Sequence, residues 1–471
     1  MYALRRYQRN AVDAALKLLT QKKKKNGLVV LPTGSGKSLV IAKTIQEYGK
    51  KTIVLQPTKE ILEQNLGKLK KFGMDDIGIF SASMGEKTIG QTTIATIGTI
   101  IKHKERFNNF DAVIVDEAHL CNSKGGQYEE FINHLNLPVL GLTATPFRMR
   151  YYEDSFNTGE YVVESRFLTR TRPRIFNTII HITQVPELFE QGYLCPIHYD
   201  YQNDYDSREI KSNSTGQGYN DNALENYNKQ QNIIQKIVNE VLKSDAKHIL
   251  IFTHFRSESQ AVIEYLYKYG ISCSEVSGET KKIDRENILS DFQSGKIRCV
   301  VNVGVLTVGF DFPELDQIII GRPMKSLALF YQISGRGLRI SEGKTHCKLT
   351  DLCDNIKRFG EINSFYIEDI SGGKELWRLK SNIGYLTGLN LLTGKDLEER
   401  QTVTHKEKKK VAEGELIIPF GKHKDKKLNI IDRDYMEWCI KNFDNKNKWK
   451  TIFKNEITRR DDINGETQTT R

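Results

Sequence analysis

Short apolar runs alternate with amphipathic stretches along most of the chain, in two successive series. In the first half, the apolar runs lie at residues 28–31, 52–55, 93–96, 112–115 and 139–142, and a helical pattern covers residues 59–72. In the second half, they lie at residues 248–252, 271–273, 298–302 and 317–320. Continuous apolar strands are typical of a parallel sheet that is covered on both faces. The pattern therefore predicts an α/β protein with two tandem lobes.

The polar stretches between and after these series suggest the domain boundaries. Residues 203–222 are rich in Ser, Asn, Asp and Gly, which is typical of a linker or a mobile loop. Residues 401–471 hold 17 Lys and Arg against 12 Asp and Glu, which predicts a small basic module. We expect a first lobe at 1–200 with a basic insertion near 151–180, a linker at 201–225, a second lobe at 226–370 and an accessory region at 371–471.

Composition excludes several classes of protein. The chain has 471 residues and a formal net charge of +11, which favours a polyanionic partner. Its seven cysteines form no C-x-x-C pair, so neither a disulfide framework nor a zinc site is expected. No apolar run is long enough to span a membrane, for which about 20 residues are needed. The polar N-terminus does not resemble a secretory signal, and we expect a cytoplasmic protein of a bacterium or a phage-infected cell.

The strongest local signal is the stretch Pro-Thr-Gly-Ser-Gly-Lys-Ser at residues 32–38, between a predicted strand and a helical pattern. Glycines let a backbone wrap closely around a phosphate, and the amides at a helix start point toward it. Lys37 is suited to the β- and γ-phosphates, and the Ser38 hydroxyl to Mg²⁺. The sequence therefore predicts an ATP site that also includes Thr33, Gly34, Ser35 and Gly36.

A second signal is the pair Asp116 and Glu117, which directly follows the predicted strand at residues 112–115. A carboxylate in that place can hold Mg²⁺ opposite a phosphate loop. The neighbouring carboxylate can orient and deprotonate the attacking water. Together with the phosphate loop, this pair predicts hydrolysis of ATP.

These motifs, in this order, resemble the superfamily 2 helicases and translocases of the DEAH-box type, over residues 4–360. The resemblance implies two RecA-like lobes with ATP between them and nucleic acid across both. In the first lobe it implies that Arg5 and Gln8 read adenine, that Thr58, Thr96 and Thr99 contact a strand, and that His119, Thr143 and Thr145 couple hydrolysis to binding.

The second lobe continues the resemblance. It implies nucleic-acid contacts by Phe255, Arg256 and Thr307, an approach of Gly309 and Asp311 to the nucleotide, and catalytic roles for Gln332, Arg336 and Arg339. The two arginines are three residues apart, so we expect both on one helical face, where they can neutralise phosphate charge. Residues 187–196 and 354–360 are similar to the branch that holds the RadD-type and type III restriction helicase subunits, close to phage branch-migration helicases.

Two basic segments lie outside these motifs. Residues 166–174 hold Arg166, Arg170, Arg172 and Arg174, and they either grip a nucleic-acid backbone or form an exposed basic hairpin. Residues 418–438 resemble a small domain of some phage and bacterial exonuclease-like proteins. Lys422 and Lys424 in its turn either contact phosphates or are solvated.

The sequence as a whole predicts an ATP- and Mg²⁺-dependent DNA helicase or translocase. We expect single-stranded, forked or branched DNA as its partner, in replication, recombination or repair, and no membrane. An RNA helicase is one alternative, although RNA is the less favoured partner. The other alternative is a subunit that uses ATP as a clamp in a restriction-type complex.

Overall fold

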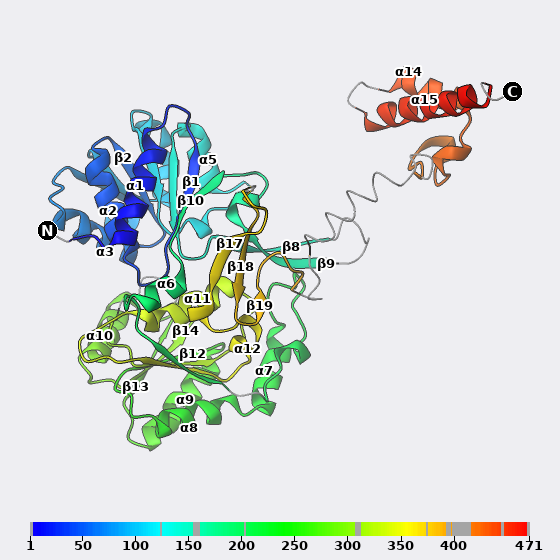
Figure 1. Ribbon diagram of the computed structural model, residues 1–471. Helices are drawn as coiled ribbons and strands as arrows, with labels where there is room; N and C mark the ends of the chain where they lie inside the picture. Colours follow the sequence, from blue (N-terminus) through cyan, green and yellow to red (C-terminus); the bar gives the residue numbers. More distant parts are fainter. Residues whose placement is uncertain are drawn as a thin grey trace. The chain divides into compact units, whose positions relative to one another are not determined.

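The computed structural model describes residues 3–122, 125–153, 161–201, 204–306, 312–373, 375–391, 397, 416–443 and 447–468. The chain divides into two compact units, residues 1–395 and residues 396–471. The first unit contains two parallel sheets, which lie one above the other in Figure 1.

The first sheet has eight strands in the order β10-β1-β7-β6-β2-β5-β3-β4, and only β4 pairs antiparallel with its neighbour. The strands are β1 (Asn26–Val30), β2 (Thr52–Gln56), β3 (Ile77–Ser81), β4 (Glu86–Lys87), β5 (Thr92–Thr96), β6 (Ala112–Val115), β7 (Val139–Thr143) and β10 (Thr178–Ile182). Because the main strands run the same way, the residues that follow β1, β2, β5, β6 and β7 meet at one edge of the sheet.

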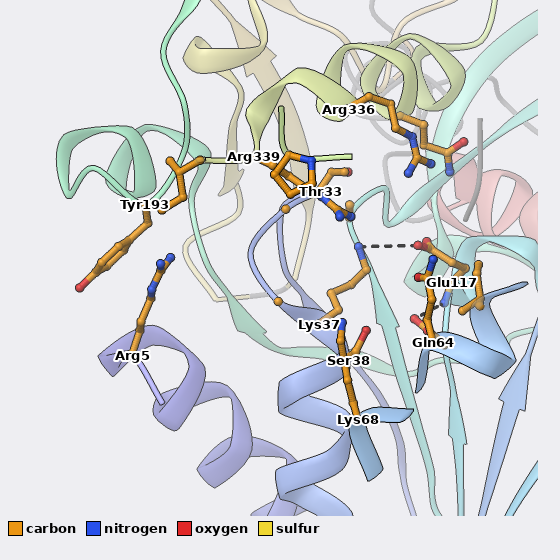
Figure 2. Close-up of a pocket in the computed structure, with 18 residues that line it drawn as sticks. Arg5, Thr33, Lys37, Ser38, Gln64, Lys68, Glu117, Tyr193, Arg336 and Arg339 are labelled. Atoms are coloured by element: carbon orange, nitrogen blue, oxygen red, sulfur yellow. Dashed lines mark hydrogen bonds and ion pairs between the residues drawn. The ribbon is translucent and has the colours of Figure 1, made fainter. Parts of the chain in front are cut away.

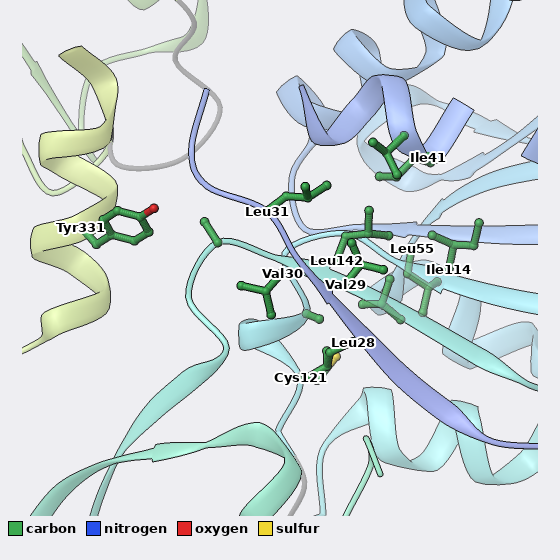
Figure 3. Packing of buried hydrophobic residues seen from close by; sticks show 14 of the residues in the cluster. Leu28, Val29, Val30, Leu31, Ile41, Leu55, Ile114, Cys121, Leu142 and Tyr331 are labelled. Atoms are coloured by element: carbon green, nitrogen blue, oxygen red, sulfur yellow. The ribbon is translucent and has the colours of Figure 1, made fainter. Parts of the chain in front are cut away.

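The apolar runs form these strands because both faces of the sheet are covered. Leu28, Val29, Leu55, Ile114 and Leu142 are fully buried and pack together, as Figure 3 shows. The packing is so close around Gly141 that an added Cβ would lie 2.6 Å from the Phe176 ring. The helices of this lobe are α1 (Arg6–Thr20), α2 (Lys37–Tyr48), α3 (Lys59–Lys71), α4 (Ile97–Ile100), α5 (Gln127–Leu135) and α6 (Val185–Glu190).

The second sheet has six parallel strands in the order β11-β16-β15-β12-β14-β13. They are β11 (Ile197–Tyr201), β12 (Ile249–Thr253), β13 (Cys273–Ser277), β14 (Cys299–Val303), β15 (Gln317–Gly321) and β16 (Cys347–Asp351). Its helices are α7 (Asp221–Gln230), α8 (Ile233–Lys243), α9 (Arg256–Lys268), α10 (Lys282–Gln293), α11 (Leu327–Ser334) and α12 (Asn355–Phe359). The predicted fold class, two tandem α/β lobes with parallel sheets, is confirmed.

Two smaller sheets complete the first unit. An antiparallel hairpin joins β8 (Phe147–Glu153) to β9 (Tyr161–Phe167), directly after β7. Strands β17 (Tyr366–Asp369), β18 (Trp377–Ser381) and β19 (Gly384–Tyr385) form the other sheet. The lobes share one apolar core, and Gln184 of the first lobe exchanges two hydrogen bonds, of 2.7 and 3.0 Å, with the backbone of Ile367.

The second unit has a core of its own. Ile418, Leu428, Met436 and Phe453 are fully buried there, between α14 (Arg433–Asn442) and α15 (Lys448–Gln468). Among the described residues of the whole chain, no helix has the length and apolar character that crossing a membrane requires.

Candidate nucleotide site and nucleic-acid surface

The loop between β1 and α2 has the backbone shape of a phosphate cradle. Gly34 and Gly36 take left-handed conformations, with φ of 82° and 84°, which glycine adopts without strain. Gly36 also has no room for a side chain, because a Cβ would lie 2.7 Å from Nε2 of Gln8. Lys37 and Ser38 then begin α2, so their side chains stand at the N-terminal end of a helix.

The two predicted carboxylates face this loop from the end of β6. The Asp116 carboxylate accepts hydrogen bonds from Asn65 Nδ2 and from the Glu117 amide, both at 2.9 Å. Glu117 has a left-handed backbone with φ of 49°, an uncommon conformation for a residue other than glycine. Its Oε1 atom lies 3.6 Å from Nζ of Lys37 (Figure 2).

The neighbouring carboxylates have different protonation tendencies. Burial, together with the negative charge of Glu117, raises the pKa of Asp116 to about 6. Burial also acts to raise the pKa of Glu117, but Lys37, His119 and Arg336 outweigh it and lower that pKa to about 2. Glu117 is therefore ionised at neutral pH and can accept a hydrogen bond from water.

A chain of hydrogen bonds connects the two lobes beside these carboxylates. Nε2 of Gln332, on α11, lies 2.9 Å from Nε2 of His119. Nδ1 of His119 lies 3.1 Å from Oγ1 of Thr143 and 3.3 Å from Oε2 of Glu117. The Thr143 hydroxyl also accepts a hydrogen bond of 3.0 Å from the amide of Thr145. The predicted coupling residues therefore contact one another and one predicted catalytic residue of the second lobe.

Arg336 and Arg339 approach the loop from the second lobe, but the expectation that they share a helical face is wrong. Helix α11 ends at Ser334, Arg336 lies in the 3₁₀ turn Gly335–Leu338, and Arg339 is extended, with φ of −76° and ψ of 135°. The turn can approach the phosphate loop because Gly335 has no side chain. A Cβ at this position would lie only 2.8 Å from Cβ of Thr33. Burial lowers the pKa of each guanidinium to about 10, so both remain charged at neutral pH.

These groups line a single cleft with a volume of about 310 Å³. Its walls include most of the residues predicted for ATP and Mg²⁺: Arg5, Thr33, Gly34, Gly36, Lys37, Ser38, Asp116, Glu117, Gln332, Arg336 and Arg339. Sequence reasoning missed Gln64, Lys68 and Tyr193, which also line it. Gln64 and Lys68 are one helical turn apart on the predicted helix at 59–72. That spacing places both side chains on one face of the helix, and it could have indicated that they act together. Tyr193 lies within residues 187–196, whose resemblance to a helicase branch assigned the tyrosine no role.

Gln8 lies behind the cleft wall and is only 4% exposed. Its Oε1 accepts a hydrogen bond from the Arg5 amide, and its Nε2 donates to the carbonyl of Ser35, both at 2.9 Å. Arg5 itself extends over the ring of Tyr193, with 4.2 Å between the guanidinium carbon and the ring centroid. The structure thus uses Gln8 to attach α1 to the phosphate loop. Gly309 and Asp311 lie outside the described residues.

In the first lobe, the residues predicted to contact nucleic acid follow the carboxyl ends of two adjacent β-strands, β2 and β5. Thr58 caps α3, with 3.4 Å between its Oγ1 and the Ile61 amide. Thr96 and Thr99 lie 3.1 Å apart, measured between their hydroxyl oxygens.

The predicted contacts of the second lobe lie at the start of α9. Phe255 is the residue before this helix, and Arg256 begins it. The Arg256 guanidinium forms ion pairs with Glu275, at 2.8 Å, and with Glu279. Thr307 lies outside the described residues.

The two basic segments have distinct surroundings. Arg166 lies in β9, Arg170 ends a 3₁₀ turn at Leu168–Arg170, and Arg172 and Arg174 are exposed beyond it. In the second unit, Lys422 lies over the Tyr435 ring, 5.2 Å from its centroid, and Lys424 follows the 3₁₀ turn Gly421–His423.

Comparison with known families agrees with this arrangement. Residues 1–148 match the family described as "Type III restriction enzyme, res subunit", and residues 229–341 match the "Helicase conserved C-terminal domain". The chain belongs to superfamily 2 of the helicases. One match lies in each of the two lobes whose residues meet in the cleft.

Among relatives of this helicase chain is the "Putative ATP-dependent helicase IRC3" of Saccharomyces cerevisiae, 27% identical over 74% of the chain and 51% of the relative. Another is the "DNA 3'-5' translocase XPB2" of Sulfurisphaera tokodaii, 26% identical over 71% of the chain and 78% of the relative. The chain thus spans about half the length of the yeast relative. The "ATP-dependent Type ISP restriction-modification enzyme LlaBIII bound to DNA" has a similar fold, with a TM-score of 0.53, 18% identity, and coverage of 75% of this chain and 28% of that one.

Proposed function

We propose that this protein is an ATP-driven DNA translocase or helicase. The observation that carries the proposal is the cleft, in which the phosphate loop and two carboxylates of one lobe face two buried arginines of the other. A site assembled from both lobes can close around a nucleotide and open after hydrolysis. That alternation is what moves a two-lobed motor along a strand.

Each group in the cleft has a role that its position supports. The backbone amides near Gly34 and Gly36 and the Lys37 ammonium bind the phosphates. The Ser38 hydroxyl and the Asp116 carboxylate, both hard oxygen donors lining the cleft, fit Mg²⁺. When bound, the metal neutralises phosphate charge. Glu117 accepts a proton from the attacking water, and Arg336 and Arg339 stabilise the charge that develops on the transferred phosphoryl group.

The adenine base has a place beside the loop, at the cleft wall. Arg5 and Tyr193 form a flat cationic and aromatic pair at the cleft wall, where a base can stack. Gln8, already bonded to the loop, positions Ser35 in this conformation. We infer that Arg5 and Tyr193 hold the base and that Gln8 supports the loop from behind.

DNA is the partner that the evidence favours. One relative is named a DNA translocase, and the chain carries a formal charge of +11. Thr58, Thr96 and Thr99 lie at one edge of the first sheet and supply hydroxyl groups to a strand, with Phe255 on the second lobe. We propose that single-stranded DNA binds along these residues. We propose branched or forked DNA as the preferred substrate, with its arms held by Arg166–Arg174 and by Lys422 and Lys424. RNA, or a clamp role in a restriction-type complex, is the alternative.

The decisive experiment measures ATP hydrolysis in the presence of single-stranded, duplex, forked and four-way DNA, with RNA in parallel. We expect DNA to stimulate hydrolysis more than RNA does. Glu117→Gln should still bind ATP but turn over at least ~10²-fold more slowly, the usual scale for loss of a general base. Glu264→Gln, on the exposed face of α9, is the matched control. Normal turnover by Glu117→Gln would refute the assignment, and equal stimulation by RNA would favour the alternative.

A further inference from the structure

One face of the β8–β9 hairpin carries an unusual concentration of positive charge. The register pairs Arg148 with Arg166 and Arg150 with Glu164, so these four side chains and Tyr152 stand on the same face. Two like charges directly opposite each other destabilise an antiparallel pair. Glu164 offsets part of this repulsion, and the face as a whole remains positive.

The hairpin itself supplies little compensation. Glu164 forms an ion pair with Arg166, whose guanidinium also lies over the Tyr152 ring, 5.4 Å from the centroid. Arg148 donates a hydrogen bond of 2.6 Å to the carbonyl of Cys121. Arg150, and Arg172 beside the hairpin, form no ion pair with any described carboxylate, and Arg172 donates one hydrogen bond of 2.9 Å to the carbonyl of Thr171. Their charges are therefore available to a ligand.

These side chains surround a depression of about 420 Å³. Arg148, Arg150, Arg166 and Arg172 line it together with Asn122 and Tyr152, and no acidic side chain is among its described walls. Of the four arginines that the sequence singled out, only Arg166 and Arg172 belong to it. Arg148 and Arg150, on the preceding strand, replace Arg170 and Arg174. The basic site is thus a face of a hairpin and not a linear stretch of chain.

We propose that this face binds the phosphodiester backbone of a DNA strand. Guanidiniums bind phosphate oxygens with two parallel hydrogen bonds, which suits them better than lysines to this task. Arg148 and Arg150 are separated by about 6.6 Å along the strand, so they present a row of donors to a row of phosphates. The inference rests on the proposed function and adds a named DNA site to it.

The hairpin face is close in sequence to the residues of the hydrogen-bond chain beside the cleft. Strand β8 begins at Phe147, immediately after the segment that holds Thr143 and Thr145. Arg148 contacts Cys121, two residues beyond His119. DNA held here therefore contacts residues that lie within a few positions in sequence of both segments of the hydrogen-bond chain, and we expect its binding to contribute to stimulation of ATP hydrolysis.

The test uses the full chain and a fluorescently labelled single-stranded oligonucleotide, with anisotropy measured over a salt titration. The double variant Arg150→Ala/Arg172→Ala should bind at least about tenfold more weakly, the scale of losing charged hydrogen bonds. Its log–log salt slope should fall by about 1.4, since each lost phosphate contact on a single strand removes roughly 0.7. Arg150→Lys/Arg172→Lys should keep the slope, because charge is retained, and lose only part of the affinity.

Arg208→Ala is the control, because Arg208 is an exposed arginine that lies outside both the depression and the basic segments. It should change affinity and slope little, and thermal unfolding shows whether each variant folds. Wild-type binding by the double variant would overturn the inference, as would an equal loss in Arg208→Ala, which would indicate diffuse charge. A wild-type chain that binds no DNA would refute the proposed function itself. The two failures are thus distinguishable.

Discussion

The hydrogen bond between Gln332 and His119 is the contact by which we expect the second lobe to sense the state of the first. The two nitrogens of this bond lie 2.9 Å apart, and the other ring nitrogen of His119 contacts Thr143 and Glu117. Donation from the Gln332 amide requires an unprotonated Nε2, which leaves the imidazole proton on Nδ1, facing Thr143 and Glu117. Replacing either partner with alanine removes the same link.

The size of the effect follows from the chemistry of the contact. A hydrogen bond between uncharged groups contributes about 0.5–1.5 kcal/mol net, which corresponds to a factor of about 2 to 13 in rate. If the bond acts in DNA-stimulated turnover, either single substitution already removes it, so the product of the two single effects counts its loss twice. His119→Ala/Gln332→Ala should then be about 2- to 13-fold more active than the product of the two single effects.

The assay is a double-mutant cycle on the turnover rate at saturating ATP and single-stranded DNA. His119→Ala combined with Lys268→Ala, an exposed lysine on α9, is the control cycle, and its effects should multiply. Multiplication in the His119 and Gln332 cycle as well would mean that the two residues act independently. The contact would then have no part in communication between the lobes.

Three further predictions concern other parts of the chain. Arg336→Ala and Arg339→Ala should reduce turnover by roughly 10³-fold for whichever residue stabilises the transition state, measured at saturating ATP. Gly141→Ala should lower the free energy of unfolding by about 1–3 kcal/mol through overpacking, whereas Gly67→Ala, on an open helix surface, should raise it by about 0.5–1 kcal/mol in the same denaturant titration. Removal of residues 401–471 should spare hydrolysis stimulated by single strands and reduce fork unwinding, and equal unwinding by both chains would refute a role for the second unit.

Most central strands were predictable from sequence, although the inner strands β3 and β16 were missed together with the edge strands β10 and β11. Strands β1, β2, β6, β7 and β12 are covered on both faces, so their sequences are continuously apolar. Strands β10 and β11 are the outer strands of their sheets and mix polar with apolar residues. Burial on both faces produces the sequence signal, and an edge strand does not need it.

The site residues were likewise predictable only where the sequence itself carries the signal. Loops that bind phosphate must be contiguous in sequence, so residues 32–38 and the pair at 116–117 could be identified directly. Asn65, which donates to Asp116, and Lys68 come from α3, and their importance depends on how that helix packs. Asn65 did leave a trace, since it is a polar residue in the buried stripe of Ile61, Leu62 and Leu69. A polar residue in an apolar stripe indicates a buried hydrogen bond.

The charge of the cleft gives a reason why its two lobes need a ligand between them. Five cationic side chains line it, namely Arg5, Lys37, Lys68, Arg336 and Arg339, against the carboxylates of Asp116 and Glu117. Burial lowers the pKa of Lys68, and the repulsion of Arg339 lowers it further. Without an anion, closure brings like charges together in a place of low dielectric. A bound nucleoside triphosphate reverses the sign of that interaction. The arginines that resist closure of the empty cleft therefore favour closure of the occupied one.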